Sequence, residues 1–110
     1  ELYVWGDYER LKQVFINIIK NSVEAINDDG VIDLDMLVND KQVIVTICDN
    51  GVGMEDEELK NIKEMFWTTK KNGTGLGVAL SNEIVVAHGG TINYNSVKNK
   101  GTECVITLSL

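Results

Sequence analysis

The fold is decided by the stretch Gln13-Val14-Phe15-Ile16-Asn17-Ile18-Ile19-Lys20-Asn21-Ser22-Val23-Glu24-Ala25. Its apolar residues recur at helical spacing, and the pattern extends from Leu11 to Ile26. Asp7 follows Gly6 and is a favourable N-cap residue, because its carboxylate can accept hydrogen bonds from the first unpaired amides. The stretch therefore predicts a helix over residues 7–27.

The segments around this helix predict strands and two shorter helices. Residues 31–38 alternate in polarity and predict a half-buried strand, which pairs through an Asn39-Asp40 turn with a second strand over residues 42–48. The remaining predicted elements are a short first strand, a helix in a charged segment, a helix ended by His88-Gly89-Gly90, and two final strands: residues 2–5, 55–63, 78–87, 91–96 and 103–110. This order indicates an α+β fold, a two-layer α/β sandwich with a mixed sheet and helices on one face.

Composition narrows the function classes. The chain has 110 residues, enough for one domain, and a net charge of −7. That charge argues against binding to nucleic acid or to an anionic membrane surface, and no apolar run approaches the ~20 residues of a membrane span. The start at Glu1 shows no signal peptide and suggests a part of a longer protein. Cys48 and Cys104 lie in apolar runs, so we expect reduced core cysteines, no zinc site and a cytoplasmic location.

The first candidate for chemistry is the pair Asn17 and Asn21. Their i, i+4 spacing places both amides on one face of the predicted helix, near the edge of its apolar stripe. Two interpretations remain open. The pair forms part of a polar, solvent-exposed face, which helix geometry alone favours, or it serves a metal and phosphate ligand.

The second candidate is Asp49-Asn50-Gly51-Val52-Gly53-Met54, directly after a predicted strand. A carboxylate at a strand end beside two glycines offers a fixed acceptor next to backbone that a flat ligand can approach closely. The exocyclic amine of adenine is a suitable donor for such a carboxylate. Ordinary turn chemistry also explains the motif.

The third candidate is Gly73-Thr74-Gly75-Leu76-Gly77, which runs into the predicted helix over residues 78–87. Glycines there leave backbone amides free to face an anion, and the helix N-terminus adds positive potential. Hydroxyls and positive charge come just before, from Thr68, Thr69, Lys70 and Lys71. The spacing matches neither a Walker A motif nor a dinucleotide-binding fingerprint. A flexible lid with a glycine-rich hinge is the alternative.

In their order along the chain, these motifs resemble the catalytic ATP-binding domain of bacterial sensor histidine kinases, in the GHKL superfamily. Residues 13–25 resemble the N box, 49–54 the G1 box, 65–70 the F box and 73–77 the G2 box. His88-Gly89-Gly90 and Gly101-Thr102 match two further marks of the family. The Thr-Thr-Lys form of the F box is most similar to the nitrogen-regulation and sporulation kinases.

The resemblance implies a role for each matching residue. Asn21 would ligate a Mg²⁺ that bridges the ATP phosphates, with Asn17 close by, and Asp49 would accept from the adenine amine, with Thr102 near the same end. Gly51 and Gly53 would allow the base to approach. Residues 55–73 would form the ATP lid. The phosphates would be held by Thr69, Lys70, Gly73, Gly75, Leu76 and Gly77.

The resemblance also implies what the chain lacks. Hydrolysing members of the superfamily carry a Glu where this chain has Asn17, and an amide cannot act as a general base. The γ-phosphoryl would instead pass to a histidine on a separate helical dimerisation domain of the same kinase, and indirectly to a response regulator. The single histidine, His88, is expected to end a helix rather than accept phosphate.

We expect the chain to be monomeric and to form a cytoplasmic protein or the cytoplasmic part of a membrane-anchored sensor. Two alternatives stay open: a GHKL protein-serine kinase of the anti-sigma type, and a nucleotide-binding module without transfer activity.

Overall fold

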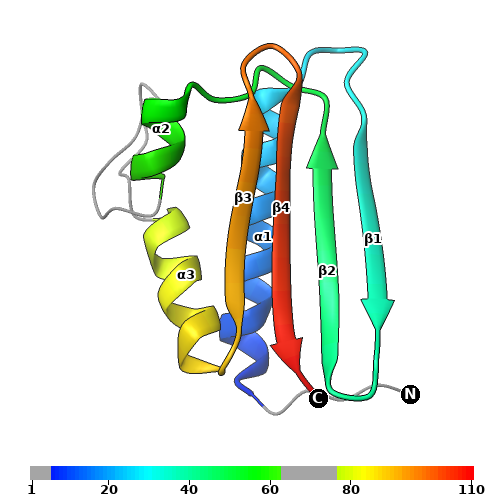
Figure 1. Cartoon of the computed structure of the whole chain (residues 1–110), viewed down its shortest axis with the longest axis vertical. Coiled ribbons are helices and arrows are strands. Elements are labelled where there is room, and N and C mark those ends of the chain that lie inside the picture. The colour runs from blue at the N-terminus through cyan, green and yellow to red at the C-terminus, as the bar shows by residue number, and fades with distance from the viewer. Residues whose placement is uncertain (1–5, 63–76) are drawn as a thin grey trace.

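Seven helices and strands make up the part of the chain that the computed structural model describes, residues 6–62 and 77–110 (Figure 1). Along the chain these elements are α1 (Tyr8–Ala25), β1 (Ile32–Val38), β2 (Gln42–Asp49), α2 (Asp56–Asn61), α3 (Gly77–Ala87), β3 (Thr91–Val97) and β4 (Gly101–Ser109). They agree with the predicted elements to within one or two residues at most ends. The predicted strand over residues 2–5 lies outside the described residues.

The four strands form one sheet in the order β1-β2-β4-β3, and every described pair is antiparallel. The sequence predicted a mixed sheet, and the pairing of the predicted strand over residues 2–5, which lies outside the described residues, remains a prediction. The antiparallel pairing of the described strands has a local reason, because β1 and β2 form one hairpin, β3 and β4 form another, and the two hairpins join through an antiparallel β2–β4 pair. The helices lie on one side of the sheet, as predicted (Figure 1).

The helix α1 forms where the apolar spacing predicted it. The Asp7 side chain accepts a hydrogen bond from the Arg10 amide at 3.2 Å and so caps the first turn. The buried side chains of α1 are Val14, Ile18 and Ser22, one turn apart on the face toward the sheet. They join a core of eight buried residues from both layers: Val14, Ile18, Ile47, Val85, Ile92, Cys104, Ile106 and Leu108.

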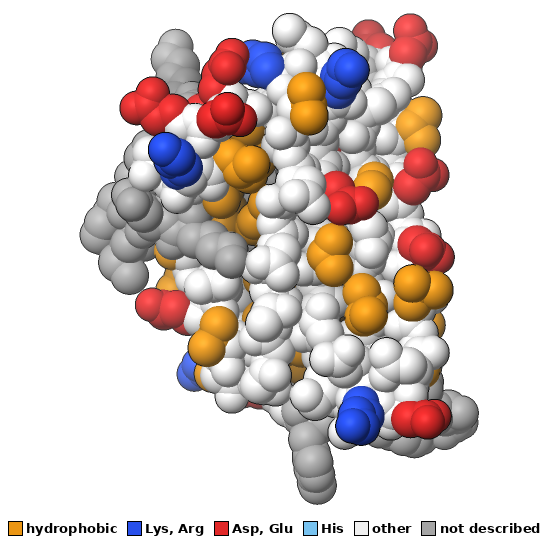
Figure 2. Space-filling view, in the orientation of Figure 1, with side chains coloured by type: hydrophobic (Ala, Val, Ile, Leu, Met, Phe, Trp, Pro, Cys, Tyr) orange, Lys and Arg blue, Asp and Glu red, His pale blue; other side chains and the backbone are white. Residues whose placement is uncertain are grey.

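The edge strand β1 is less buried than the sequence predicted. Leu34 pairs with Ile47 across the β1–β2 hairpin and lies on the same face, yet Leu34 is 60% exposed and Ile47 is 0% exposed. The reason is that α1 packs on β2 and β4 while α3 packs on β3, so β1 lies beyond the helical layer. On the opposite, open face of the sheet, acidic side chains lie along the edge formed by β1, with hydrophobic side chains beside them (Figure 2).

The two cysteines occupy opposite faces of the sheet and form no disulfide. Cys104 is buried in the core, as predicted. Cys48 is half-buried on the open face, where its Sγ lies 3.7 Å from the Glu103 carboxylate, so the prediction of a core position for it was wrong. The alternation within β2 decides this, because Ile47 takes the inward position beside it. Within the described ranges, no helix has the length and apolar character needed to cross a membrane.

Candidate functional site

Three segments meet at the end of the sheet where β2 ends. The loop after β2 is bound to the end of α1, since the Val52 amide donates to the Ala25 carbonyl at 2.9 Å. It is also bound to the β3–β4 turn, because the Asn99 amide donates to the Val52 carbonyl at 2.7 Å. Residues distant in sequence are thereby held around Asp49, the last residue of β2.

The Asp49 carboxylate is oriented by two backbone amides. Its Oδ1 accepts from the Gly51 amide at 2.9 Å and from the Thr102 amide of β4 at 3.3 Å. No hydrogen bond to Oδ2 is found within the part of the chain that the structure describes, and the residue is only half-buried. Among the described residues, one oxygen of Asp49 therefore holds the local fold and the other has no hydrogen-bond partner.

The two glycines of the same motif are explained by the packing of backbone on backbone. Gly53 has a φ of +67°, which L side chains rarely adopt, and a Cβ there would overlap the Val97 carbonyl. A Cβ on Gly51 would overlap the Ala25 carbonyl. The neighbouring helix and loop therefore approach these glycines closely, and the approach of a ligand base at the same glycines remains a prediction.

A hydroxyl pair extends the site across the sheet. Thr102 pairs with Asp49 on one side and with Ser96 of β3 on the other. The Ser96 Oγ lies 2.8 Å from the Thr102 Oγ1, accepts from the Met54 amide at 2.8 Å and donates to the Gly101 carbonyl at 2.9 Å. The sequence did not single out Ser96. Its inward place in the alternation Ile92, Tyr94, Ser96 was the available signal.

Asn17 binds α1 to α3. Its amide nitrogen donates to the Ser81 Oγ at 3.4 Å, and its Oδ1 accepts from the Gln13 side chain at 2.9 Å. Ser81 is fully buried, and the sequence did not single it out. Asn17 is half-buried at the helix–helix boundary, so the interpretation as a purely solvent-exposed polar face does not hold for it.

Asn21 lies at the level where α3 begins. The two helices run in opposite directions side by side (Figure 1), and Asn17 contacts Ser81. Asn21 is four residues further along α1 and Gly77 is four residues earlier in α3, each about 6 Å along its helix axis. The N-terminus of α3, whose first amides have no partner within the helix itself, therefore lies beside Asn21.

The other residues of the predicted phosphate-binding set, Thr69, Lys70, Gly73, Gly75 and Leu76, lie outside the described residues. The same is true of the F box and of the predicted lid beyond Ile62. The first part of that lid is the helix α2, which begins near Glu55 as predicted and contacts β3.

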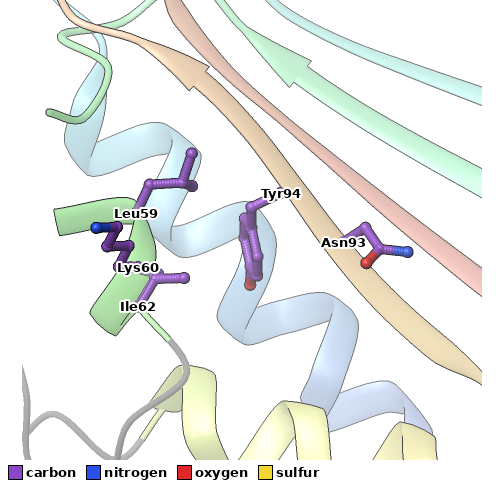
Figure 3. A pocket seen from close by; sticks show the side chains of 5 residues that line it. All are labelled: Leu59, Lys60, Ile62, Asn93 and Tyr94. Atoms are coloured by element: carbon purple, nitrogen blue, oxygen red, sulfur yellow. The ribbon is translucent and has the colours of Figure 1, made fainter. Parts of the chain in front are cut away.

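A shallow hollow of about 260 Å³ lies between α2 and β3 (Figure 3). Leu59 and Lys60 of α2 and Ile62 just after that helix line the hollow, together with Asn93 and Tyr94 of β3. The Tyr94 ring points from β3 toward the helices (Figure 3). Burial raises the pKa of the Tyr94 hydroxyl well above its usual range, and Cys104 contributes a smaller increase. The hydroxyl therefore stays neutral. The hollow includes neither Asp49 nor Thr102, so it is separate from the Asp49 end of the sheet.

His88 joins the end of α3 to the start of α1. Its Nε2 accepts from the Asp7 amide at 3.0 Å, and its Nδ1 donates to the Ile84 carbonyl at 2.6 Å. The lone pair that a phosphate acceptor needs is thus occupied by a backbone amide. His88 has the structural role that the sequence predicted for it.

Comparisons of this chain with a family model, with curated proteins and with solved structures agree with one another. Residues 6–110 match the family model described as histidine kinase-, DNA gyrase B-, and HSP90-like ATPase. Sporulation kinase B of Bacillus subtilis is 40% identical over 109 residues, which are 98% of this chain but 26% of that protein.

Among solved structures, the catalytic domain of histidine kinase ThkA matches 96% of this chain and 70% of that one, with 32% identity and a TM-score of 0.85. Full-length ShkA in complex with AMPPNP matches 90% of this chain and 21% of that one, with 26% identity and a TM-score of 0.78. The chain thus spans about a quarter of the curated relative and most of the isolated ThkA catalytic domain.

Proposed function

Because the chain belongs to the histidine kinase-, DNA gyrase B-, and HSP90-like ATPase family, we propose that it binds Mg-ATP and donates the γ-phosphoryl group to a histidine on another domain. The observation that carries the proposal is the divided carboxylate of Asp49, with Oδ1 fixed by two amides and Oδ2 available. The names of the relatives, a sporulation kinase and a histidine kinase, support the reaction type.

The adenine base binds at Asp49. The Oδ2 atom accepts from the exocyclic amine, while the two amides on Oδ1 prevent the carboxylate from turning away. Thr102 lies beside Asp49 in the adjacent strand and borders the same end of the base. The similarity to ShkA, solved with AMPPNP, supports an adenine nucleotide as the ligand.

The triphosphate extends from the base toward the start of α3. The first amides of that helix, which begins at Gly77 and has its positive end there, attract phosphate oxygens. The remaining phosphate contacts that we propose come from Thr69, Lys70, Gly73, Gly75 and Leu76. Since the whole chain carries a net charge of −7, the attraction of a polyanion must be local.

The residues present fit a Mg²⁺ that is shared with the nucleotide. The described part of the chain contains no group of three or more His, Cys, Asp or Glu side chains able to hold a metal. Mg²⁺ in nucleotide enzymes is bound by one or two protein oxygens plus phosphates, and the half-buried Asn21 amide beside the start of α3 is a suitable single ligand. When bound there, the ion would neutralise charge on the phosphates.

The environment of Asn17 favours transfer over hydrolysis. An amide cannot take a proton from water, and here its oxygen and nitrogen are already bonded to Gln13 and Ser81. His88, the one histidine of the sequence, has its nitrogens engaged. We therefore place the acceptor histidine on a helical dimerisation domain of the same kinase, with a response regulator as the next recipient. Catalysis by this chain then consists of positioning and of stabilising charge.

The test mixes the chain with Mg²⁺, γ-labelled ATP and a helical domain that carries an acceptor histidine. We expect acid-labile, alkali-stable label on that domain and none on this chain. Asn21→Ala should abolish the labelling, while the control Asn27→Ala, at an exposed position just after α1, should preserve it. Acid-stable label on a partner serine would overturn the histidine-kinase assignment, and absence of ATP binding would overturn the proposal as a whole.

A further inference from the structure

We propose that Ser96 is a positioning residue, which turns the Thr102 hydroxyl so that Thr102 faces the base as a hydrogen-bond acceptor and the site selects a 6-aminopurine. The inference rests on the proposed ATP function and adds to it a residue that determines base selectivity. It is carried by the hydrogen bonds between β3, β4 and the loop after β2.

The direction of each proton follows from counting donors around Ser96. The Gly101 carbonyl can only accept, so the single hydroxyl hydrogen of Ser96 goes to it, at 2.9 Å. The Met54 amide can only donate, so it occupies one lone pair of the Ser96 Oγ, at 2.8 Å. The contact of 2.8 Å with Thr102 must then be a bond that Thr102 donates, because Ser96 has no second hydrogen.

The consequence is that Thr102 has no donor left for a ligand. The Thr102 hydroxyl has given its hydrogen to Ser96, and the Thr102 amide has given its hydrogen to Asp49 Oδ1. The Thr102 Oγ1 and the neighbouring Asp49 Oδ2 then offer a ligand only lone pairs, so both atoms can act only as hydrogen-bond acceptors. Both residues are half-buried, so a mismatched group would lose its water there without gaining a partner.

This arrangement distinguishes two classes of purine. A 6-aminopurine such as adenine presents a hydrogen-bond donor at C6, which the lone pairs complement. A 6-oxopurine such as hypoxanthine presents a carbonyl oxygen at the same place, which they repel. Without the Ser96 hydroxyl, the Thr102 hydrogen is released and can rotate to donate to that carbonyl, so the site would reject the 6-oxopurine less strongly.

The test compares the affinities of ATP and ITP, which differ at C6, by calorimetric titration with Mg²⁺ present. The wild-type chain should prefer ATP. Ser96→Ala should lower the ratio of ATP to ITP affinity about fivefold. Ser96→Thr, which keeps a hydroxyl, should preserve the ratio. If the alanine variant does not fold, Ser96→Cys, which keeps the side-chain volume with a weaker hydrogen-bonding group, should lower the ratio in the same direction.

A double-mutant cycle with Thr102→Ala separates positioning from a general structural role. If Ser96 acts through Thr102, then Ser96→Ala should leave the ATP to ITP ratio unchanged when Thr102 is already alanine. Equal weakening of ATP and ITP by Ser96→Ala would overturn the inference, because loss of the Met54 contact alone predicts that result. In that case ATP still binds to the wild type and the proposed function stands, whereas a wild type that binds no ATP would overturn both.

Discussion

At the scale of single residues, the proposal gives Asp49 two roles, one in folding and one in binding. Its Oδ1 connects β2 to its own loop and to β4 through the amides of Gly51 and Thr102. Amides that bond a carboxylate also fix its orientation, so Oδ2 is presented at a defined place. The recognition of a ligand amine then requires no movement of the side chain.

Cys48 gives a test of the electrostatics on the open face of the sheet. Burial raises the pKa of its thiol, and the Glu103 carboxylate raises that pKa further, so thiolate is scarce at neutral pH. Glu103→Gln should lower the pKa and increase the rate at which iodoacetamide alkylates Cys48 at pH 8 by about two- to fivefold. Peptide mass spectrometry measures the rate at Cys48 separately from the buried Cys104.

The control for this variant is Glu83→Gln, which removes an exposed carboxylate on α3. It should leave the alkylation rate of Cys48 unchanged. A rate in Glu103→Gln that equals or falls below the wild-type rate would contradict the assigned cause of the raised pKa.

Some residues of the site have a local sequence pattern, whereas others are important only because of partners on other elements. Asp49 was singled out because a carboxylate at a strand end before two glycines is a recognisable local pattern, although ordinary turn chemistry also explains that pattern. Ser81 and Ser96 were not, because their importance comes from partners on other elements, Asn17 in α1 for Ser81 and the Met54 amide for Ser96. A lone serine in a helix or strand carries no local signal of such a contact.

At the scale of elements, His88 connects the end of α3 to the start of α1. His88→Ala removes the bonds to the Asp7 amide and the Ile84 carbonyl, so it should lower the free energy of unfolding by about 1–2 kcal/mol in urea titration. The control Asn93→Ala, at an exposed position on the outer face of β3, should cost less than about 0.5 kcal/mol.

The same variant tests the proposed direction of phosphoryl transfer. His88→Ala should still label a partner histidine, because His88 is placed outside the reaction. Loss of that labelling with ATP binding intact would contradict the structural role of His88.

The exposed position of β1 predicts that alanine substitutions at two cross-strand neighbours lower the free energy of unfolding by unequal amounts. Ile47→Ala should destabilise the fold by about 2–5 kcal/mol, because it leaves a cavity in the core. Leu34→Ala, at its partner in the register, should cost less than about 1 kcal/mol, since Leu34 is already largely in solvent. Equal losses in urea titration would indicate that β1 is covered in solution.

The strand β1 also shows which structural properties a local sequence pattern predicts and which it does not. Alternation predicted the strand and which residues share a face, and both predictions are confirmed by the register with β2. Burial was predicted wrongly, because it depends on how far the helices extend across the sheet. The helix α1 reaches β2 and β4, and no local pattern in residues 31–38 records this.

At the scale of the whole molecule, the α+β class and the helices on one face of the sheet were predictable from the order of elements. The fully antiparallel pairing of the described strands was not, because strand order depends on how the two hairpins dock. Three segments assemble around Asp49, where we propose that the base binds, and the roles of Asp49, Thr69, Lys70, Gly73, Gly75 and Leu76 remain predictions.

Calorimetric titration with Mg-ATP tests whether the Asp49 end of the sheet binds the base of ATP. The wild type should bind one ATP, and Asp35→Asn, which alters an exposed carboxylate on β1, should bind it equally well. Asp49→Asn keeps an acceptor for the Gly51 and Thr102 amides but presents an amide group in place of the charged carboxylate, so its affinity should fall at least about tenfold. Equal affinities of Asp49→Asn and the wild type for ATP, or no binding of ATP by the wild type, would contradict the proposal that Asp49 binds the base.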